Sequence, residues 1–299
     1  MQGLTLPLCF RTLNLGLILK NATIQHKIIG VINHFAKGYF KKMSIELHWA
    51  DCFDVFPSIK DQSIDLVLCD PPYGTTACKW DTVLPLDKMW KELERIVKPD
   101  KPIILFGSEP FSSVLRLSNL KNYKYDWYWQ KEKPTNPMQL KNRPGKTIET
   151  ISVFYKKQTN YFPVKTKHFG KLVKNKPSET ATVGSLVTKN KLKVKPYNDD
   201  GTRYPTQLLS FNREVLTKIV HPTQKPVALL EYLIKTYSLE GETVLDFTMG
   251  SGSTGIACKN TNRNFIGIEK EKEYFDIAKQ RILTEGVQEP EIDICSMFN

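Results

Sequence analysis

The stretch Ile64-Asp65-Leu66-Val67-Leu68-Cys69-Asp70-Pro71-Pro72-Tyr73 decides the fold of this chain. Its first six residues form an apolar run that only Asp65 interrupts, which predicts a buried strand of a parallel sheet. Ligand sites in open α/β sheets lie just beyond the carboxyl ends of such strands. The tetrapeptide Asp70–Tyr73 therefore stands where the chemistry of an α/β fold is expected.

The residue types of the tetrapeptide suit the activation of an amine. An exocyclic amine of a nucleobase is a weak nucleophile, because its lone pair is delocalised into the ring, so a catalyst must accept hydrogen bonds from both N–H groups. The Asp70 carboxylate and the Pro71 carbonyl supply two acceptors, and Pro71 and Pro72 stiffen the loop. Tyr73 offers a flat face for an unstacked base. The alternative is an ordinary strand-ending turn, since Asp, Pro and Gly74 are common turn residues.

A glycine-rich loop forms the second motif. Thr243–Phe247 has the pattern of a strand, and Thr248–Gly255 leads from it into a helical start at Ile256. Bare backbone and a helix N-terminus allow a ligand to approach closely. The next short strand, Asn264–Ile268, is followed by Glu269, whose carboxylate is positioned to take both hydroxyls of a ribose. This βαβ unit predicts a nucleoside site.

The glycines of this loop also match the dinucleotide fingerprint of nicotinamide dehydrogenases, at Gly250, Gly252 and Gly255. In such a dehydrogenase this unit usually lies near the N-terminus, and most strands of the sheet follow it in the sequence. Here about one more helix, Tyr274–Leu283, is expected after the unit. The other strands of the sheet therefore precede it in the sequence. A dehydrogenase stays as an alternative enzyme, which would use the glycine loop and give Tyr73 no role.

In this order, the motifs resemble those of the β class of DNA amino-methyltransferases. In that family the catalytic motif precedes a target-recognition region and the glycine-rich cofactor motif comes last, a circular permutation of the usual order. The resemblance covers roughly residues 44–285. It implies an α/β fold, a Rossmann-like S-adenosylmethionine-dependent methyltransferase sheet with helices on both faces. The implied catalytic residues are Asp70, Pro71, Pro72 and Tyr73.

The resemblance also implies how S-adenosylmethionine is held. His221–Pro226 matches the segment that covers the methionine end, where Lys225 and Thr223 are expected to meet the methionyl carboxylate. Asp51–Phe53 matches the segment around the adenine, with a loop acid before a helix as its alternative. The implied cofactor residues are Asp51, Cys52, Phe53, Asp70, His221, Thr223, Lys225, Asp246, Phe247, Gly250, Ser251, Gly252 and Glu269.

Charge and position point to a polyanionic partner. The chain has 299 residues, a formal charge of +12 and a pI near 9.3. Eleven lysines and one acid fall between Lys156 and Lys195, where relatives keep their target-recognition region. Phosphate contact is the prediction, and a solvated face or a disordered loop is the alternative. Two candidate DNA contacts, Lys133 and Asn136, lie on the loop between the expected strands Tyr125–Trp129 and Glu149–Phe154. The other candidates lie in the lysine-rich segment and are Lys165, Lys167, Lys171, Lys174, Lys176, Lys189, Lys191 and Lys193.

Five segments are expected along the chain. They are an N-terminal extension of unknown role (1–42), a catalytic half (43–155), an inserted target-recognition region (156–220), a cofactor-binding half (221–285) and a C-terminal tail (286–299).

The six cysteines form no C-x-x-C pair and have no histidine at metal-ligand spacing, so reduced intracellular thiols and no metal are expected. No apolar stretch reaches membrane-spanning length, and a cytoplasmic location, at the nucleoid in a prokaryote, is expected.

The implied reaction is methyl transfer from S-adenosylmethionine to the N6 amine of adenine in double-stranded DNA, after the base has been flipped out. Adenine is favoured because relatives with Asp before the two prolines mostly modify adenine, whereas those with Ser mostly modify cytosine at N4. Cytosine-N4 methylation and an RNA or protein amide methyltransferase stay open. So does a DNA-binding protein without turnover. The sequence leaves open a cognate restriction endonuclease and a homodimer.

Overall fold

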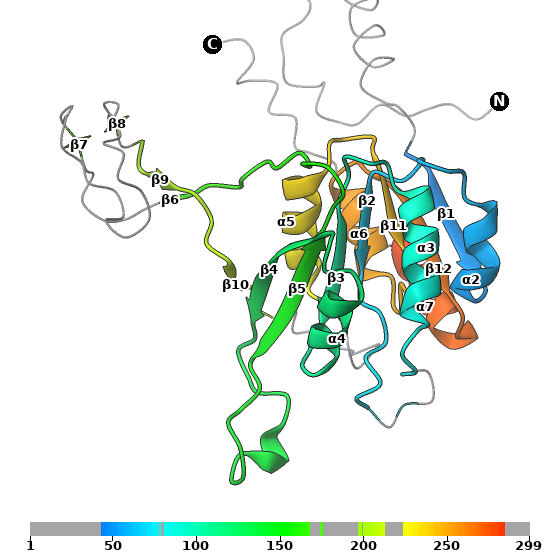
Figure 1. Cartoon of the computed structure of the whole chain (residues 1–299), viewed down its shortest axis with the longest axis horizontal. Coiled ribbons are helices and arrows are strands. Elements are labelled where there is room, and N and C mark those ends of the chain that lie inside the picture. Colours follow the sequence, from blue (N-terminus) through cyan, green and yellow to red (C-terminus); the bar gives the residue numbers. More distant parts are fainter. Residues whose placement is uncertain are drawn as a thin grey trace, which may run out of the picture. The chain divides into compact units, whose positions relative to one another are not determined.

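The computed structural model describes residues 43–76, 78, 81–167, 174–175, 197–198, 200–212 and 224–284. The predicted extension 1–42 and tail 286–299 lie outside this part of the chain. An eight-stranded sheet in the order β1-β12-β11-β2-β3-β5-β4-β10 forms its centre (Figure 1). Its strands are β1 (Ile45–Trp49), β2 (Leu66–Cys69), β3 (Ile103–Gly107), β4 (Tyr123–Gln130), β5 (Ile148–Phe154), β10 (Leu208–Ser210), β11 (Thr243–Asp246) and β12 (Asn264–Glu269).

Strand direction places several carboxyl ends at one edge of the sheet. β1, β12, β11, β2 and β3 run parallel, β5 is antiparallel to β3 and β4, and β10 is parallel to β4. The last strand, β12, lies beside the first, β1, and β11 lies beside β2. This arrangement confirms the predicted Rossmann-like sheet with its permuted motif order. It also brings the segments that follow β2, β11 and β12 together.

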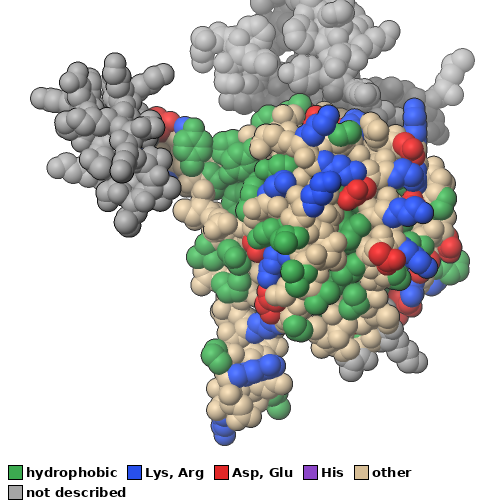
Figure 2. Space-filling model, in the orientation of Figure 1, with side chains coloured by type: hydrophobic (Ala, Val, Ile, Leu, Met, Phe, Trp, Pro, Cys, Tyr) green, Lys and Arg blue, Asp and Glu red, His purple; other side chains and the backbone are tan. Residues whose placement is uncertain are grey.

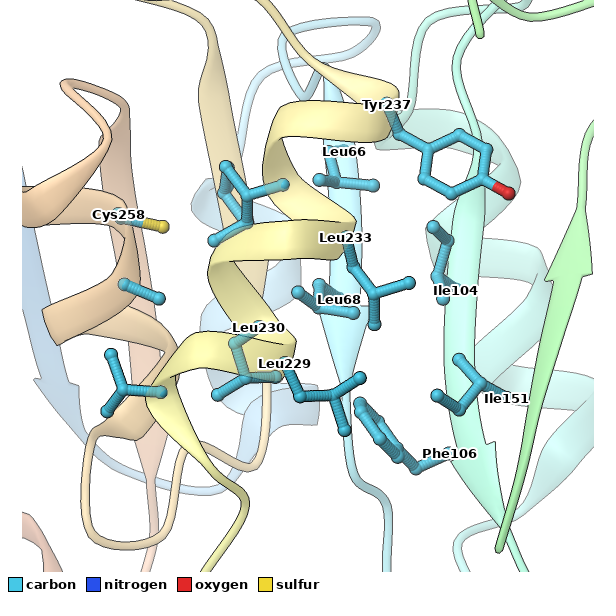
Figure 3. Packing of buried hydrophobic residues seen from close by; sticks show 14 of the residues in the cluster. Leu66, Leu68, Ile104, Phe106, Ile151, Leu229, Leu230, Leu233, Tyr237 and Cys258 are labelled. Carbon is cyan, nitrogen blue, oxygen red and sulfur yellow. The ribbon is translucent and has the colours of Figure 1, made fainter. Parts of the chain in front are cut away.

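Helices cover both faces of the sheet because side chains alternate along each strand. Leu66 and Leu68 belong to one core cluster, whereas Val67 and Cys69 belong to the other. Figure 3 shows α5 against the first face, with Leu233 near the β2 leucines. The helices are α2 (Cys52–Val55), α3 (Leu86–Ile96) and α4 (Phe111–Ser118) on one face, and α5 (Val227–Tyr237), α6 (Ser253–Asn260) and α7 (Lys272–Thr284) on the other.

The remaining elements are short. Two 3₁₀ turns are η2 (Phe56–Ser58) and η3 (Pro137–Gln139), and the paired short strands are β6 (Thr166–Lys167) with β9 (Thr202–Arg203) and β7 (Lys174–Asn175) with β8 (Tyr197–Asn198). The β4–β5 hairpin extends from the sheet, and it carries Lys and Arg side chains (Figures 1 and 2). No helix among the described residues is long and apolar enough to cross a membrane.

Candidate active site

Asp70 lies at the carboxyl end of β2, among parallel neighbours. The Tyr73 hydroxyl donates to its Oδ1, and Lys225 Nζ forms an ion pair with its Oδ2. The Thr248 hydroxyl donates to the Asp70 backbone carbonyl at 3.1 Å. Burial raises the pKa of Asp70, against the opposing attraction of Lys225. Both carboxylate oxygens are thus engaged by groups of the protein.

The Tyr73 side chain is held by its hydroxyl, which donates to Asp70, and by its ring. Its ring stacks on Phe111, the first residue of α4, with centroids 5.1 Å apart and an interplanar angle of 24°. Burial, aided by the negative charge of Asp70, raises the pKa of the Tyr73 phenol well above its ordinary value. The phenol therefore stays protonated and donates to Asp70. Stacking of a target base on this ring stays a prediction.

Asp81 holds the loop that carries the tetrapeptide. Its Oδ1 accepts hydrogen bonds from the backbone amides of Tyr73 at 2.7 Å and Gly74 at 2.9 Å. Its Oδ2 accepts from the amides of Thr75 at 2.8 Å and Thr76 at 2.6 Å. Four amides thus converge on one carboxylate. Asp81 was not predicted from the sequence, because nothing in its local sequence indicates that it folds back onto the loop.

Two carboxylates brace the glycine loop. Asp246 at the end of β11 accepts from the Thr254 hydroxyl at 2.6 Å and the Thr248 amide at 3.2 Å. Glu269 at the end of β12 accepts from the Gly250 amide at 2.9 Å. Burial raises the pKa of Asp246 to about 6, and burial also raises the pKa of Glu269. The loop is therefore tied to the ends of the two strands that flank it.

Helix α7 packs against the same loop. The Arg281 guanidinium donates to the Ser251 carbonyl at 2.7 Å and to its hydroxyl at 3.0 Å. Gly252 has φ +80°, and a Cβ atom there would lie 2.9 Å from the Cβ of Ala278. Glycine is required on both grounds, since an L side chain disfavours this φ and there is no room for it. Ser251 and Gly252 of the predicted cofactor loop are thus positioned by α7.

A cavity of about 150 Å³ joins the two motifs. Asp70 lies in its wall together with Asp246, Phe247, Gly250 and Glu269 from the glycine-loop side. Its position at the carboxyl ends of β2, β11 and β12 is the one predicted for a ligand site in an open α/β sheet. The structure therefore brings the two motifs, far apart in sequence, into one site.

The predicted adenine segment lies partly in this cavity. Asp51 and Cys52 line it. Asp51 also accepts a hydrogen bond from the Phe53 amide at 3.0 Å as the N-cap of α2, which is the capping role considered as an alternative. Phe53 packs edge-on against Phe56, with centroids 5.7 Å apart, and is not part of the wall.

Lys225 lies between two acids. Its Nζ pairs with Asp70 and lies 3.5 Å from Glu149 Oε2, while Glu149 Oε1 pairs with Lys131. Glu149 and Lys131 were not predicted to be site residues. The available signal was a charged residue, Glu149, in an otherwise mostly apolar strand segment. His221 and Thr223, predicted beside Lys225 at the methionine end, lie outside the described residues.

The predicted DNA contacts are described only in part. Lys133 is exposed on the β4–β5 hairpin, and Asn136 closes that hairpin by accepting from the Lys146 amide at 2.6 Å. Lys165 pairs with Asp200 at 3.2 Å, and Lys167 is exposed in β6. Of Lys174 only the backbone, in β7, is described. The candidates outside the described residues are Lys171, Lys176, Lys189, Lys191 and Lys193.

Comparison with known families decides the identity. Residues 64–280, most of the chain, match the model of the N6/N4 DNA methylases. The chain belongs to this family. The N6/N4 methylase assignment confirms the predicted resemblance, and the nicotinamide dehydrogenase alternative is wrong.

Individual relatives agree with this family. The type II methyltransferase M2.LlaDCHI of Lactococcus lactis subsp. cremoris is 28% identical over 288 residues, covering 86% of this methylase and 96% of the relative. The solved M1.HpyAVI–SAM complex is 30% identical with a TM-score of 0.53, covering 80% of this chain and 98% of that chain. The cytosine-N4-specific PvuII methyltransferase has a TM-score of 0.57 over 82% of this chain and 88% of that chain, but its 16% identity shows the fold alone.

Proposed function

We propose that this DNA methylase transfers a methyl group from S-adenosylmethionine to the N6 amine of adenine in double-stranded DNA. The observation that carries the proposal is the placement of Asp70, on a loop held by Asp81, in the wall of a cavity that extends to the glycine loop. The M1.HpyAVI–SAM complex and the type II relatives support the cofactor and the DNA substrate. We infer a role in restriction–modification from the same relatives.

The described residues fit an adenosyl group. Glu269 and Asp51 line the cavity. Their carboxylates would accept hydrogen bonds from the ribose hydroxyls and the adenine amine of a bound cofactor. The backbone at Gly250 leaves room for close approach. Bound S-adenosylmethionine supplies a methyl group on a positively charged sulfur.

The protein's part in the reaction is to place and polarise the target amine. Asp70 and the Pro71 carbonyl accept hydrogen bonds from the two N–H groups of the amine. These hydrogen bonds expose the nitrogen lone pair to the methyl group. The nitrogen–carbon bond forms as the sulfur–carbon bond breaks, and the cationic nitrogen then loses a proton. Tyr73, protonated and held on Phe111, keeps Asp70 aligned and presents its ring to the flipped base.

Adenine is preferred because Asp precedes the two prolines at this site, and β-class relatives with Asp in this position mostly modify adenine. Cytosine-N4 methylation is the second candidate, because it needs the same polarisation of an exocyclic amine. A cognate endonuclease and a homodimer are both compatible with the proposal.

The test is to incubate the purified protein with unmethylated genomic DNA and S-adenosylmethionine, digest the DNA to nucleosides and identify methylated species by mass spectrometry. N6-methyldeoxyadenosine is the expected product. N4-methyldeoxycytidine would keep the mechanism and change the base, and absence of both would contradict the proposal.

Asp70→Ala is expected to lower kcat about 100-fold or more, with a much smaller change in the cofactor Kd measured by calorimetry. The reason is that the variant loses the acceptor that polarises the amine and keeps the glycine loop. Asp54→Ala, at an exposed aspartate of α2, is the control and is expected to retain full turnover. Wild-type turnover by Asp70→Ala would remove Asp70 from the mechanism.

A further inference from the structure

Glu149 is a buried acid beside the active site that the mechanism above does not use. Glu149 lies in β5, and 9% of its surface is exposed to solvent. Lys131 pairs with its Oε1, and Lys225 Nζ lies 3.5 Å from its Oε2. Within the described part of the chain, Oε2 accepts no hydrogen bond. Lys225 therefore has a second acid within reach, with an oxygen that is not yet hydrogen-bonded.

In the arrangement described, Tyr73 donates to Oδ1 of Asp70 and the Lys225 ammonium pairs with Oδ2, so the target amine has to share the carboxylate with both groups. The amine approaches more freely if one of the two groups moves. The Tyr73 ring is held by its stacking on Phe111, whereas the Lys225 ammonium ends a flexible four-carbon stem. Lys225 is therefore the group with the greater freedom to move.

A buried ammonium that leaves one acid needs another, since an unpaired buried charge is strongly unfavourable. Glu149 meets this need. Burial opposes its ionisation, but Lys225 and Lys131 outweigh burial and lower the pKa of Glu149. Burial likewise opposes the charge on Lys225, and Asp70 and Glu149 outweigh it and raise the pKa of Lys225. Both groups are thus charged, as an exchange of ion-pair partners requires.

We propose that Glu149 is a positioning residue that receives the Lys225 ammonium when the target amine takes its place on Asp70. The shift needed is small, because the ammonium already lies between the two acids. Lys131 holds Glu149 in place from the other side. This inference rests on the proposed function, since it assigns Glu149 to the binding step of the same amine.

Glu149→Gln tests the exchange in turnover. Glutamine keeps the size of the side chain and removes its charge, so kcat is expected to fall about tenfold or more with the cofactor Kd changed less than about threefold. Glu149→Asp, which restores the charge, is expected to recover part of the loss. Asp126→Asn is the matched control, because Asp126 is a buried acid of the adjacent strand β4 that pairs with Arg116 at 3.1 Å, away from Lys225. It is expected to lower Tm and to leave kcat near the wild-type value.

A double-mutant cycle on Tm tests the sharing of Lys225 without any turnover. Asp70→Asn and Glu149→Gln each leave Lys225 one acid, whereas the double variant leaves it none. The double variant is therefore expected to lose more stability than the sum of the single variants.

Additive losses would overturn the proposal, and so would wild-type kcat in Glu149→Gln. A wild-type protein that methylates no DNA would instead overturn the proposed function, and the cycle would still decide whether the two acids share Lys225.

Discussion

At the scale of single residues, the Asp81 carboxylate shows how a distant side chain sets the shape of a catalytic loop. Asp81→Asn replaces one acceptor oxygen by an N–H group, which would face backbone amides that also donate. The loop is expected to loosen, with kcat lowered about tenfold and Tm lowered. Asp100→Asn, at an exposed acid before β3, is the control and is expected to change neither quantity.

The same residue predicts a pH dependence of stability. Burial opposes ionisation of Asp81, but hydrogen bonds from Thr76, Gly74 and Thr75 outweigh burial and lower its pKa. Its contribution to stability is therefore complete above the unfolded pKa of an aspartate, about 4, and is lost as pH falls through the lower folded pKa. The Tm difference between wild type and Asp81→Asn should narrow below about pH 4. A constant difference down to pH 3 would show that the charge of Asp81 does not matter.

Residues also show what sequence can and cannot reveal. Asp70, Gly250 and Glu269 follow strands in recognisable local patterns, so their convergence at one cavity was predictable. Asp81 and Glu149 reach the site through contacts that depend on how separate loops and strands fold together. No local pattern encodes such contacts, and they emerge only from the structure.

At the scale of elements, the glycine loop and α7 form one packed unit. Gly252→Ala places a Cβ 2.9 Å from Ala278 and strains a φ of +80°. The free energy of unfolding is expected to fall by about 2–4 kcal/mol, and cofactor affinity is expected to fall with it. Chemical denaturation and calorimetry measure the two effects.

Gly241→Ala separates strain from steric overlap. Gly241 has a similar φ of +77°, and nothing lies within 4 Å of a Cβ built there. This variant is expected to show only the backbone cost, about 1–2 kcal/mol, with cofactor affinity unchanged. Equal losses in the two glycine variants would show that packing of α7 is unimportant.

Elements were predicted well where periodicity was strong. The strand expected over 243–247 matches β11 (Thr243–Asp246), and the helix expected over 274–283 lies within α7 (Lys272–Thr284). The strand expected over 125–129 is longer in the structure, because β4 continues through a register shift between Tyr123 and Tyr125. Irregular pairing of this kind depends on the partner strand and leaves no periodic signal.

At the scale of the whole molecule, the +12 charge predicts salt-dependent binding to DNA. Lys133→Ala on the exposed β4–β5 hairpin is expected to weaken binding on all DNA sequences and to reduce the slope of log K against log salt by about 1. Lys88→Ala, at an exposed lysine of α3, is the control and is expected to keep the slope. Fluorescence anisotropy across a salt series measures both, and an unchanged slope for Lys133→Ala would remove the hairpin lysine from the DNA contact.

The strand order has a consequence for synthesis on the ribosome. β1 and β2 emerge early, but the strands that separate them in the finished sheet, β11 and β12, come from residues 243–269. At typical rates of translation the apolar β2 waits roughly 10 to 35 seconds for its neighbour β11. During that time its edge is open to pairing with other nascent chains. Chaperone capture of the growing chain therefore matters more for this strand order than for one in which neighbouring strands are made in succession.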